Sequence, residues 1–281
     1  MKRTNNGPIL SALILCTGLL FSCGQQKAKQ ESQAENESAE MVGNDKAALY
    51  SVAYTISTMM ILIVSAVNSS LTPVIYKKLD EYENTKINCN ILRRQIINVT
   101  TPICLLIAVL CLVTMLFAPE VILIFAGKRY MEAVYVVPPV SLSVYFIFLY
   151  SMFSNVEYYY QKTKLISIAT FISAVLNLVL NAIFIKLFGF CAAGYTTLVS
   201  YICLAIMHFI FYSVIIKNNK MKYVFDIRMI LIISVFLVFI MILITMTYKD
   251  MLIRYGFIFL IMLLCFCKKN RIIEIIIKMK G

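Results

Sequence analysis

The sequence predicts an all-α integral membrane protein, a bundle of about seven transmembrane helices. Hydrophobic residues make up 61% of the 281 residues and charged residues only 14%, whereas a soluble domain carries roughly 25% charged residues. The long apolar runs are hydrophobic on every side, so they lack the polar face that a soluble helix or strand presents to water. Short basic clusters separate these runs, as the connections of a membrane bundle would.

Residues 1–23 predict a signal peptide of the lipoprotein type. Lys2 and Arg3 form a basic start, and the apolar stretch 9–21 is shorter than a spanning helix. The stretch ends in Leu20-Phe21-Ser22-Cys23, which resembles the lipobox of bacterial lipoproteins. That resemblance implies that Cys23 is lipidated and becomes the new N-terminus. The alternative is an uncleaved signal anchor.

Two polar segments flank the apolar region. Residues 24–44 are rich in Gln, Glu, Ser, Lys and Asn and predict a disordered tether that is too polar to bury a core. The composition changes abruptly at Met41, where the polar tract ends. A natural fusion, a gene rearrangement and an engineered fusion would each produce such a change. Residues 269–281 place isoleucines among charged side chains, and this basic amphipathic tail is expected to lie at the membrane surface and bind anionic lipids.

Seven apolar stretches lie within residues 45–268. Each is about long enough, at 1.5 Å per residue, to cross a hydrocarbon core of roughly 30 Å. We place the spans at 50–74, 101–125, 134–158, 165–187, 191–216, 229–248 and 251–267. Only a few residues around Lys249 and Asp250 separate the last two spans, which predicts a tight helical hairpin.

The distribution of Lys and Arg predicts the orientation, because basic residues stay on the cytoplasmic side. One set of alternate loops carries sixteen of them and the opposite set carries five. The first span is therefore expected to start in the periplasm and the C-terminus to lie in the cytoplasm. The leader agrees, since a secretion signal exports the segment that follows it. We expect a multi-pass protein of the bacterial inner membrane.

Five short sequence segments within residues 45–217 resemble segments of a known protein family. They are Ala48-Leu49-Tyr50-Ser51-Val52-Ala53-Tyr54 in a span ending Leu71-Thr72-Pro73, then Ala126-Gly127-Lys128-Arg129-Tyr130-Met131-Glu132-Ala133, Asn155-Val156-Glu157-Tyr158-Tyr159-Tyr160-Gln161-Lys162-Thr163, Asn177-Leu178-Val179-Leu180-Asn181, and Gly189 to Thr197. In order and spacing this region resembles the O-antigen or oligosaccharide flippases, the polysaccharide biosynthesis members of the multidrug/oligosaccharidyl-lipid/polysaccharide exporter superfamily.

The resemblance implies one lobe of a fourteen-helix, two-lobed flippase, with the N-terminal lobe missing. The implied substrate is an undecaprenyl-pyrophosphate-linked oligosaccharide, moved across the inner membrane. Two lobes must rock about a shared site, so this chain alone is expected to be inactive and to need self-association or a separate N-terminal lobe. The alternative is a lipoprotein-like membrane anchor or fusion product with no transport activity.

Polar residues inside the spans are the candidates for a substrate path, because they are costly in lipid. Glu157 is either an interface anchor beside Tyr158–Tyr160 or a gate that pairs with a cation such as Lys162 or Lys164. His208, the only histidine, is either a packed residue or a proton relay. The sequence alone does not decide between the two interpretations of Glu157 or between the two of His208.

Three asparagines complete the candidate set. Asn177 and Asn181 are four residues apart and share a helix face, where they either bond to a neighbouring helix or contact sugar or pyrophosphate in a cavity. Asn68 either serves in the packing of two helices or lines the substrate path. The cationic residues Lys186 and Arg254 lie near span ends, so neither is expected to be a central substrate ligand.

Other functional classes find little support in the sequence. The cysteines are mostly single and lie in apolar runs, and Cys265 and Cys267 lack the spacing of a metal or redox pair. We expect no metal and no cofactor. The basic residues form no continuous face, so we expect no nucleic-acid partner. No nucleophile with a base, carboxylate pair or phosphate loop indicates an enzyme.

Overall fold

The computed structural model describes residues 44–85, 88–250, 253–256 and 259, and every regular element in those residues is helical. The elements are α2 (Asn44–Thr85), α3 (Cys89–Leu116), α4 (Ala118–Phe125), the 3-10 helix η1 (Lys128–Tyr135), α5 (Val137–Tyr159), α6 (Thr163–Phe188), α7 (Cys191–Asn218) and α8 (Ile227–Thr247). Six of them, α2, α3, α5, α6, α7 and α8, are long and apolar enough to cross a membrane. The predicted class, an all-α membrane bundle, is confirmed.

Five predicted spans agree with α2, α5, α6, α7 and α8, although α2 extends well beyond its predicted ends. The predicted span 101–125 does not correspond to one helix, because it covers the later part of α3 and all of α4. The helix α3 starts at Cys89, where the side chain of Asn88 caps it by accepting from the Asn90 N–H. It ends at Leu116, because Pro119 starts the separate helix α4 and prolines favour a first helical turn.

Several predicted segments lie outside the described residues. They are the leader with Cys23, nearly all of the tether, the basic tail and most of the predicted span 251–267. The described residues 253–256 and 259 of that span are helical.

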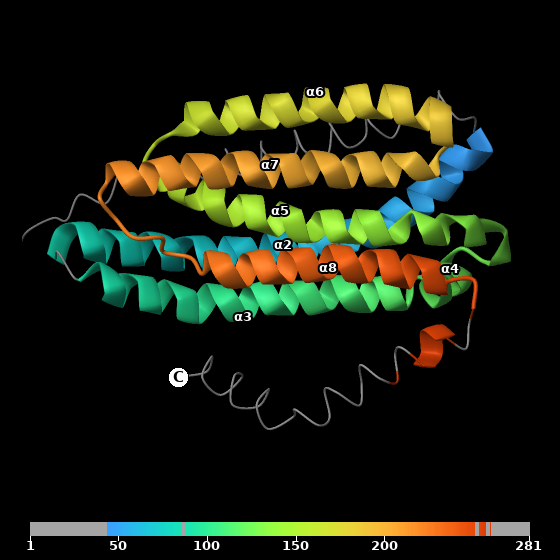
Figure 1. Ribbon diagram of the computed structural model, residues 1–281, viewed down its shortest axis with the longest axis horizontal. Helices are drawn as coiled ribbons and strands as arrows, with labels where there is room; N and C mark the ends of the chain where they lie inside the picture. Colours follow the sequence, from blue (N-terminus) through green and yellow to red (C-terminus); the bar gives the residue numbers. More distant parts are fainter. Residues whose placement is uncertain (1–43, 86–87, 251–252, 257–258, 260–281) are drawn as a thin grey trace, which may run out of the picture.

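The central helix of the bundle is α5. Of its most apolar 18-residue window, 89% is buried, against 17–39% for the other five spanning helices. It contacts α7, α2, α3 and α8, and it lies between α7 and α2 in Figure 1. The outer helices expose large apolar side chains, such as Phe171 on α6 and Leu231 and Phe236 on α8. Such surfaces suit hydrocarbon, because no polar group needs water there.

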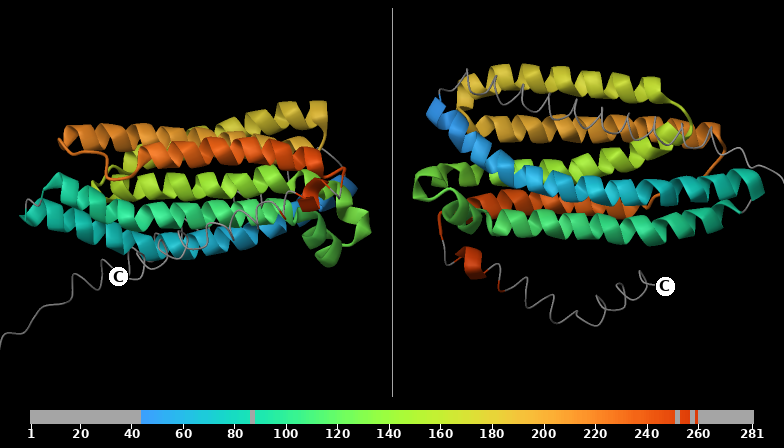
Figure 2. Two further views of the ribbon diagram at one scale, coloured as in Figure 1. Left: turned by 60° about the horizontal axis from the view of Figure 1, so that its bottom comes forward. Right: turned by 180° about the vertical axis from the view of Figure 1, so that it is seen from behind.

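The spanning helices alternate in direction, so α2, α5 and α7 run one way and α3, α6 and α8 the other (Figures 1 and 2). The α2–α3, α5–α6 and α7–α8 connections therefore meet at one end, on the left in Figure 1, which we call the basic end. These are the connections in which the sequence concentrates Lys and Arg. Helices α4 and η1 lie at the opposite end.

Two glycines shape the start of α7. Gly189 ends α6 with a φ of 78°, a left-handed conformation that side chains disfavour. Gly194 lies where α7 meets the start of α5, and a Cβ atom there would lie 3.1 Å from both Pro139 Cγ and Val136 Cγ1. The absence of a side chain at Gly194 lets the two helices approach closely.

Candidate functional site

The central feature of the interior is a carboxylate–imidazole pair. Glu157 on α5 and His208 on α7 are both 0% exposed, and Glu157 Oε1 lies 2.8 Å from His208 Nδ1. Of the possible partners, Glu157 thus contacts His208 and neither Lys162 nor Lys164, so the predicted pairing with one of these lysines is wrong. Lys162 and Lys164 are exposed at the basic end, whereas α7 covers the face of α5 that carries Glu157.

The pair is one of several successive side-chain contacts between α5 and α7. Tyr150 stacks on His208, with ring centroids 5.5 Å apart, and on Tyr201, with centroids 6.4 Å apart. Tyr150 and Glu157 are seven residues apart, as are Tyr201 and His208, and seven residues make about two helical turns. The two parallel helices therefore meet in one register, and this register brings together two candidates that lie far apart in the sequence.

The pair has unused hydrogen-bonding capacity. Among the described residues, neither Glu157 Oε2 nor His208 Nε2 has a hydrogen-bond partner. The arrangement can hold a proton between a carboxylate and an imidazole, whose second nitrogen can exchange a proton with another group. Both side chains are fully buried where α5 packs against α7.

Asn68 takes part in a bridge between α2 and α5. Asn155 Nδ2 donates to Asn68 Oδ1 at 3.0 Å, and the Thr72 hydroxyl donates to Asn155 Oδ1 at 3.2 Å. Asn155 is two residues from Glu157, so one helix carries both polar contacts. Asn155 was not predicted from the sequence as a site residue, although it is a polar residue in the same apolar span as Glu157.

Asn181 connects α6 to α7, and Asn177 supports it from the preceding turn of α6. Asn181 Nδ2 donates to Asn177 Oδ1 at 3.1 Å, and the Thr196 hydroxyl donates to Asn181 Oδ1. Nearby, the Ser173 hydroxyl donates to the Ser200 carbonyl oxygen at 3.0 Å. These contacts place the two asparagines in helix packing between α6 and α7, apart from the Glu157–His208 pair.

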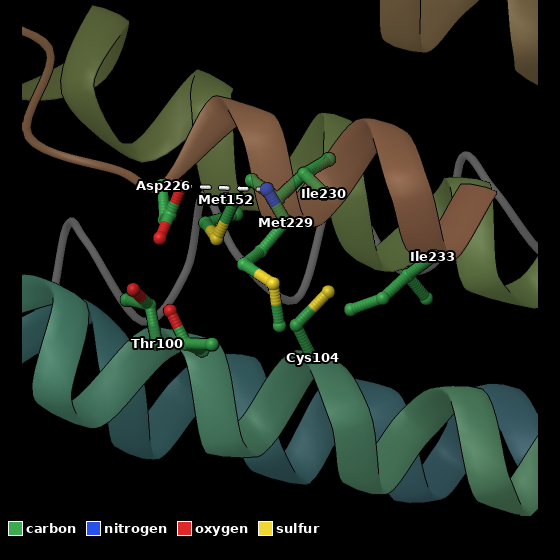
Figure 3. Close-up of a pocket in the computed structure, with 8 residues that line it drawn as sticks. Thr100, Cys104, Met152, Asp226, Met229, Ile230 and Ile233 are labelled. Atoms are coloured by element: carbon green, nitrogen blue, oxygen red, sulfur yellow. Dashed lines mark hydrogen bonds between the residues drawn. The ribbon is translucent and has the colours of Figure 1, made fainter. Parts of the chain in front are cut away.

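The interior pocket between α3, α5 and α8 is small. Thr100 and Cys104 of α3, Met152 of α5 and Met229 of α8 point into it (Figure 3). Its volume is about 10 Å³, which is room for roughly one water molecule. Asp226 lies at its edge and caps α8 by accepting from the Met229 N–H at 3.3 Å. This pocket cannot hold an oligosaccharide.

Tyrosines join α5 to α2 at the basic end. The Tyr159 hydroxyl donates to Asp80 Oδ1 at 2.8 Å, and the Tyr160 hydroxyl donates to Glu83 Oε1 at 2.9 Å. Burial, followed by the hydrogen bond to Glu83, raises the pKa of Tyr160 above its ordinary value. The hydroxyl therefore stays protonated and keeps donating at neutral pH.

A second charged contact lies at the opposite end, and the sequence did not predict it. Arg254 is buried and forms an ion pair with Glu120 of α4, and the Tyr255 hydroxyl donates to the same Glu120 oxygen at 2.7 Å. The Arg254 guanidinium also lies 5.0 Å from the centre of the Tyr255 ring. Arg254 thus attaches the residues after α8 to α4.

The six long apolar helices define a multi-pass α-helical membrane protein. Comparisons of the chain with protein-family models, with curated proteins and with solved structures find no match.

Proposed function

We propose that this chain is one lobe of a flippase-type transporter for undecaprenyl-pyrophosphate-linked oligosaccharides, and that the lobe is inactive alone. The observation that carries the proposal is the buried Glu157–His208 pair on the central helix, taken together with the sequence resemblance over residues 45–217. Ionisable side chains inside membrane bundles are costly and typically mark substrate or proton pathways. In this proposal the pair controls the separation of α5 and α7.

The packed interior supports the proposal of a single lobe. Transporters built from two repeats bind their substrate between the repeats, so an isolated lobe needs no substrate-sized cavity of its own. The pocket of about 10 Å³ between α3, α5 and α8 fits that expectation. The partner is then a separate N-terminal lobe or a second copy of this chain.

The test is restoration of glycan export in a bacterial strain that lacks its oligosaccharide flippase. The chain is expressed alone and together with N-terminal lobes taken from several family members. We expect export only in a combination, with loss of export for Glu157→Gln and for His208→Phe. Lys164→Gln at the exposed basic end is the matched control and should leave export unchanged.

Two outcomes contradict the proposal. Export by the chain alone contradicts the inactivity of the single lobe, unless crosslinking shows that two copies associate. Failure of every combination, with the protein present in the membrane at normal level, contradicts the flippase function itself.

The small interior pocket and the lipobox-like residues Leu20–Cys23 also support a second candidate, a lipoprotein-like anchor without transport activity. This candidate predicts palmitate labelling that disappears in Cys23→Ala while glycan export stays the same. Retention of the label in Cys23→Ala would contradict lipidation at that residue.

We infer an inner-membrane location with the N-terminal tether in the periplasm and the C-terminus in the cytoplasm. The gathering of the Lys- and Arg-rich connections at one end supports this orientation. Fusions to alkaline phosphatase, which is active only in the periplasm, test it. A fusion after Lys128 should be active and a fusion after Lys220 inactive, and the reverse result would contradict the orientation.

A further inference from the structure

A groove of about 770 Å³ lies at the basic end, where α7 meets the start of α3 and the α7–α8 connection. It has three cationic side chains, two hydroxyl-bearing ones and an apolar remainder. The lining residues are Arg93, Lys217, Lys222, Ser213, Tyr223, Phe209, Ile210, Val214, Ile216 and Met221. None of the residues that line it is acidic.

Two of the three cations are held in place by neutral groups. Arg93 Nε donates to the Tyr223 carbonyl oxygen at 3.1 Å, and Lys222 Nζ donates to Asn90 Oδ1 at 2.9 Å. Lys217 lies in the last turn of α7. In the described part of the chain, no carboxylate lies within ion-pair distance of these three side chains. Their positive charge is therefore available to an anionic ligand.

The groove continues into an apolar stripe on the outer face of α7. Ile206, Ile210 and Val214 are four residues apart, so they follow one helix face, and each is about half exposed. The stripe leads from the middle of α7 to Lys217. An apolar surface that faces hydrocarbon thus adjoins a cluster of cations at the expected level of the lipid headgroups.

Aromatic contacts hold the wall of the groove in shape. The Tyr223 ring stacks on Phe209 with centroids 6.3 Å apart. The buried Tyr212 hydroxyl accepts from the Val224 N–H at 2.8 Å, which fixes the α7–α8 connection against α7. The cations and the apolar stripe are therefore held together by the fold.

We propose that this groove binds one anionic glycerophospholipid, with its phosphate at Arg93, Lys217 and Lys222 and an acyl chain along the Ile206–Val214 stripe. The cations complement the charge of the headgroup, and the stripe complements the chain. Phospholipid is also abundant in the membrane that surrounds α7, so mass action favours it as the occupant. The proposal is independent of the transport function.

Tryptophan fluorescence tests the proposal directly, because the chain contains no Trp. Val214→Trp places an indole in the groove, and Leu178→Trp on the exposed face of α6 is the control. The full chain is reconstituted in bilayers that contain brominated phosphatidylglycerol or brominated phosphatidylcholine, which quench a nearby indole. If Val214→Trp fails to fold, Ile210→Trp replaces it.

We expect phosphatidylglycerol to outcompete phosphatidylcholine at Val214→Trp but not at Leu178→Trp. A single Lys or Arg near an anionic lipid contributes roughly fivefold in affinity. Adding Lys217→Gln to Val214→Trp should therefore reduce the preference about fivefold, whereas adding Lys164→Gln, also at the basic end, should not change it.

Three results would overturn the proposal. The first is equal preference for phosphatidylglycerol at the two Trp positions. The second is a preference that Lys217→Gln leaves unchanged. The third is loss of the lipid quenching on addition of millimolar inorganic phosphate, which would identify the groove as a site for free phosphate.

Discussion

Removal of one partner from the Glu157–His208 pair should be far more damaging than removal of both. His208→Phe keeps a ring to stack on Tyr150 but deprives Glu157 Oε1 of its partner, while Glu157 Oε2 already lacks one. Both side chains of the pair are 0% exposed, so a carboxylate would be left buried without compensation. Breaking such a buried pair costs about 3–5 kcal/mol of folding free energy.

The companion variants separate loss of the pair from loss of packing. Glu157→Met alone leaves the His208 imidazole with one hydrogen bond fewer, which costs about 1–3 kcal/mol. The double variant Glu157→Met/His208→Phe buries two apolar side chains of similar size. Such a replacement is often nearly neutral, so the double variant should be more stable than His208→Phe alone.

The assay is unfolding of the purified full chain in mixed micelles of a mild detergent and dodecyl sulfate, followed by the circular dichroism of the helices. Lys162→Met, at an exposed position of the basic end, is the control and should change stability by less than about 0.5 kcal/mol. Independent sites add within about 0.5 kcal/mol. If the double variant equals the sum of the single variants within that margin, the interaction between Glu157 and His208 is refuted.

Three further changes test other contacts, measured by the same unfolding assay. Asn155→Leu removes two hydrogen bonds to α2 and should cost about 1 kcal/mol in a membrane bundle; no measurable change would mean that the bridge adds nothing. Gly194→Val inserts a side chain against the start of α5 and should cost about 1–3 kcal/mol, whereas Gly256→Val, with no atom within 4 Å of its Cβ position, should cost less. Arg254→Gln removes the charged partner of Glu120 and should cost about 2 kcal/mol, and an unchanged stability would contradict the structural role of that ion pair.

The apolar segments were predictable because the requirement of the membrane is local. A helix satisfies its own backbone hydrogen bonds, so a run of apolar residues such as 229–248 indicates a span without reference to its neighbours. The end of α3 was less predictable. Both Pro102 and Pro119 lie in the apolar run, and α3 accommodates the first while the second begins a new helix.

The candidate site was predictable only as a set of residues. Glu157, His208, Asn68, Asn177 and Asn181 stood out because polar groups are costly in lipid, and the structure gives each of them a hydrogen-bond partner. The partners were not predictable. His208 is 51 residues from Glu157, whereas the cations Lys162 and Lys164 are near it in sequence but lie at the exposed basic end.

By itself, the sequence determined the membrane class, most of the spanning helices and the residues that break their apolar character. Hydrophobicity and helix geometry depend on residues close together in the chain, which explains that success. Only the tertiary structure decided that α5 lies at the centre, that α5 and α7 pack in parallel, and that Arg93 of α3 joins Lys217 and Lys222 around one groove. Those facts depend on which helix faces meet, and the faces belong to segments far apart in the sequence.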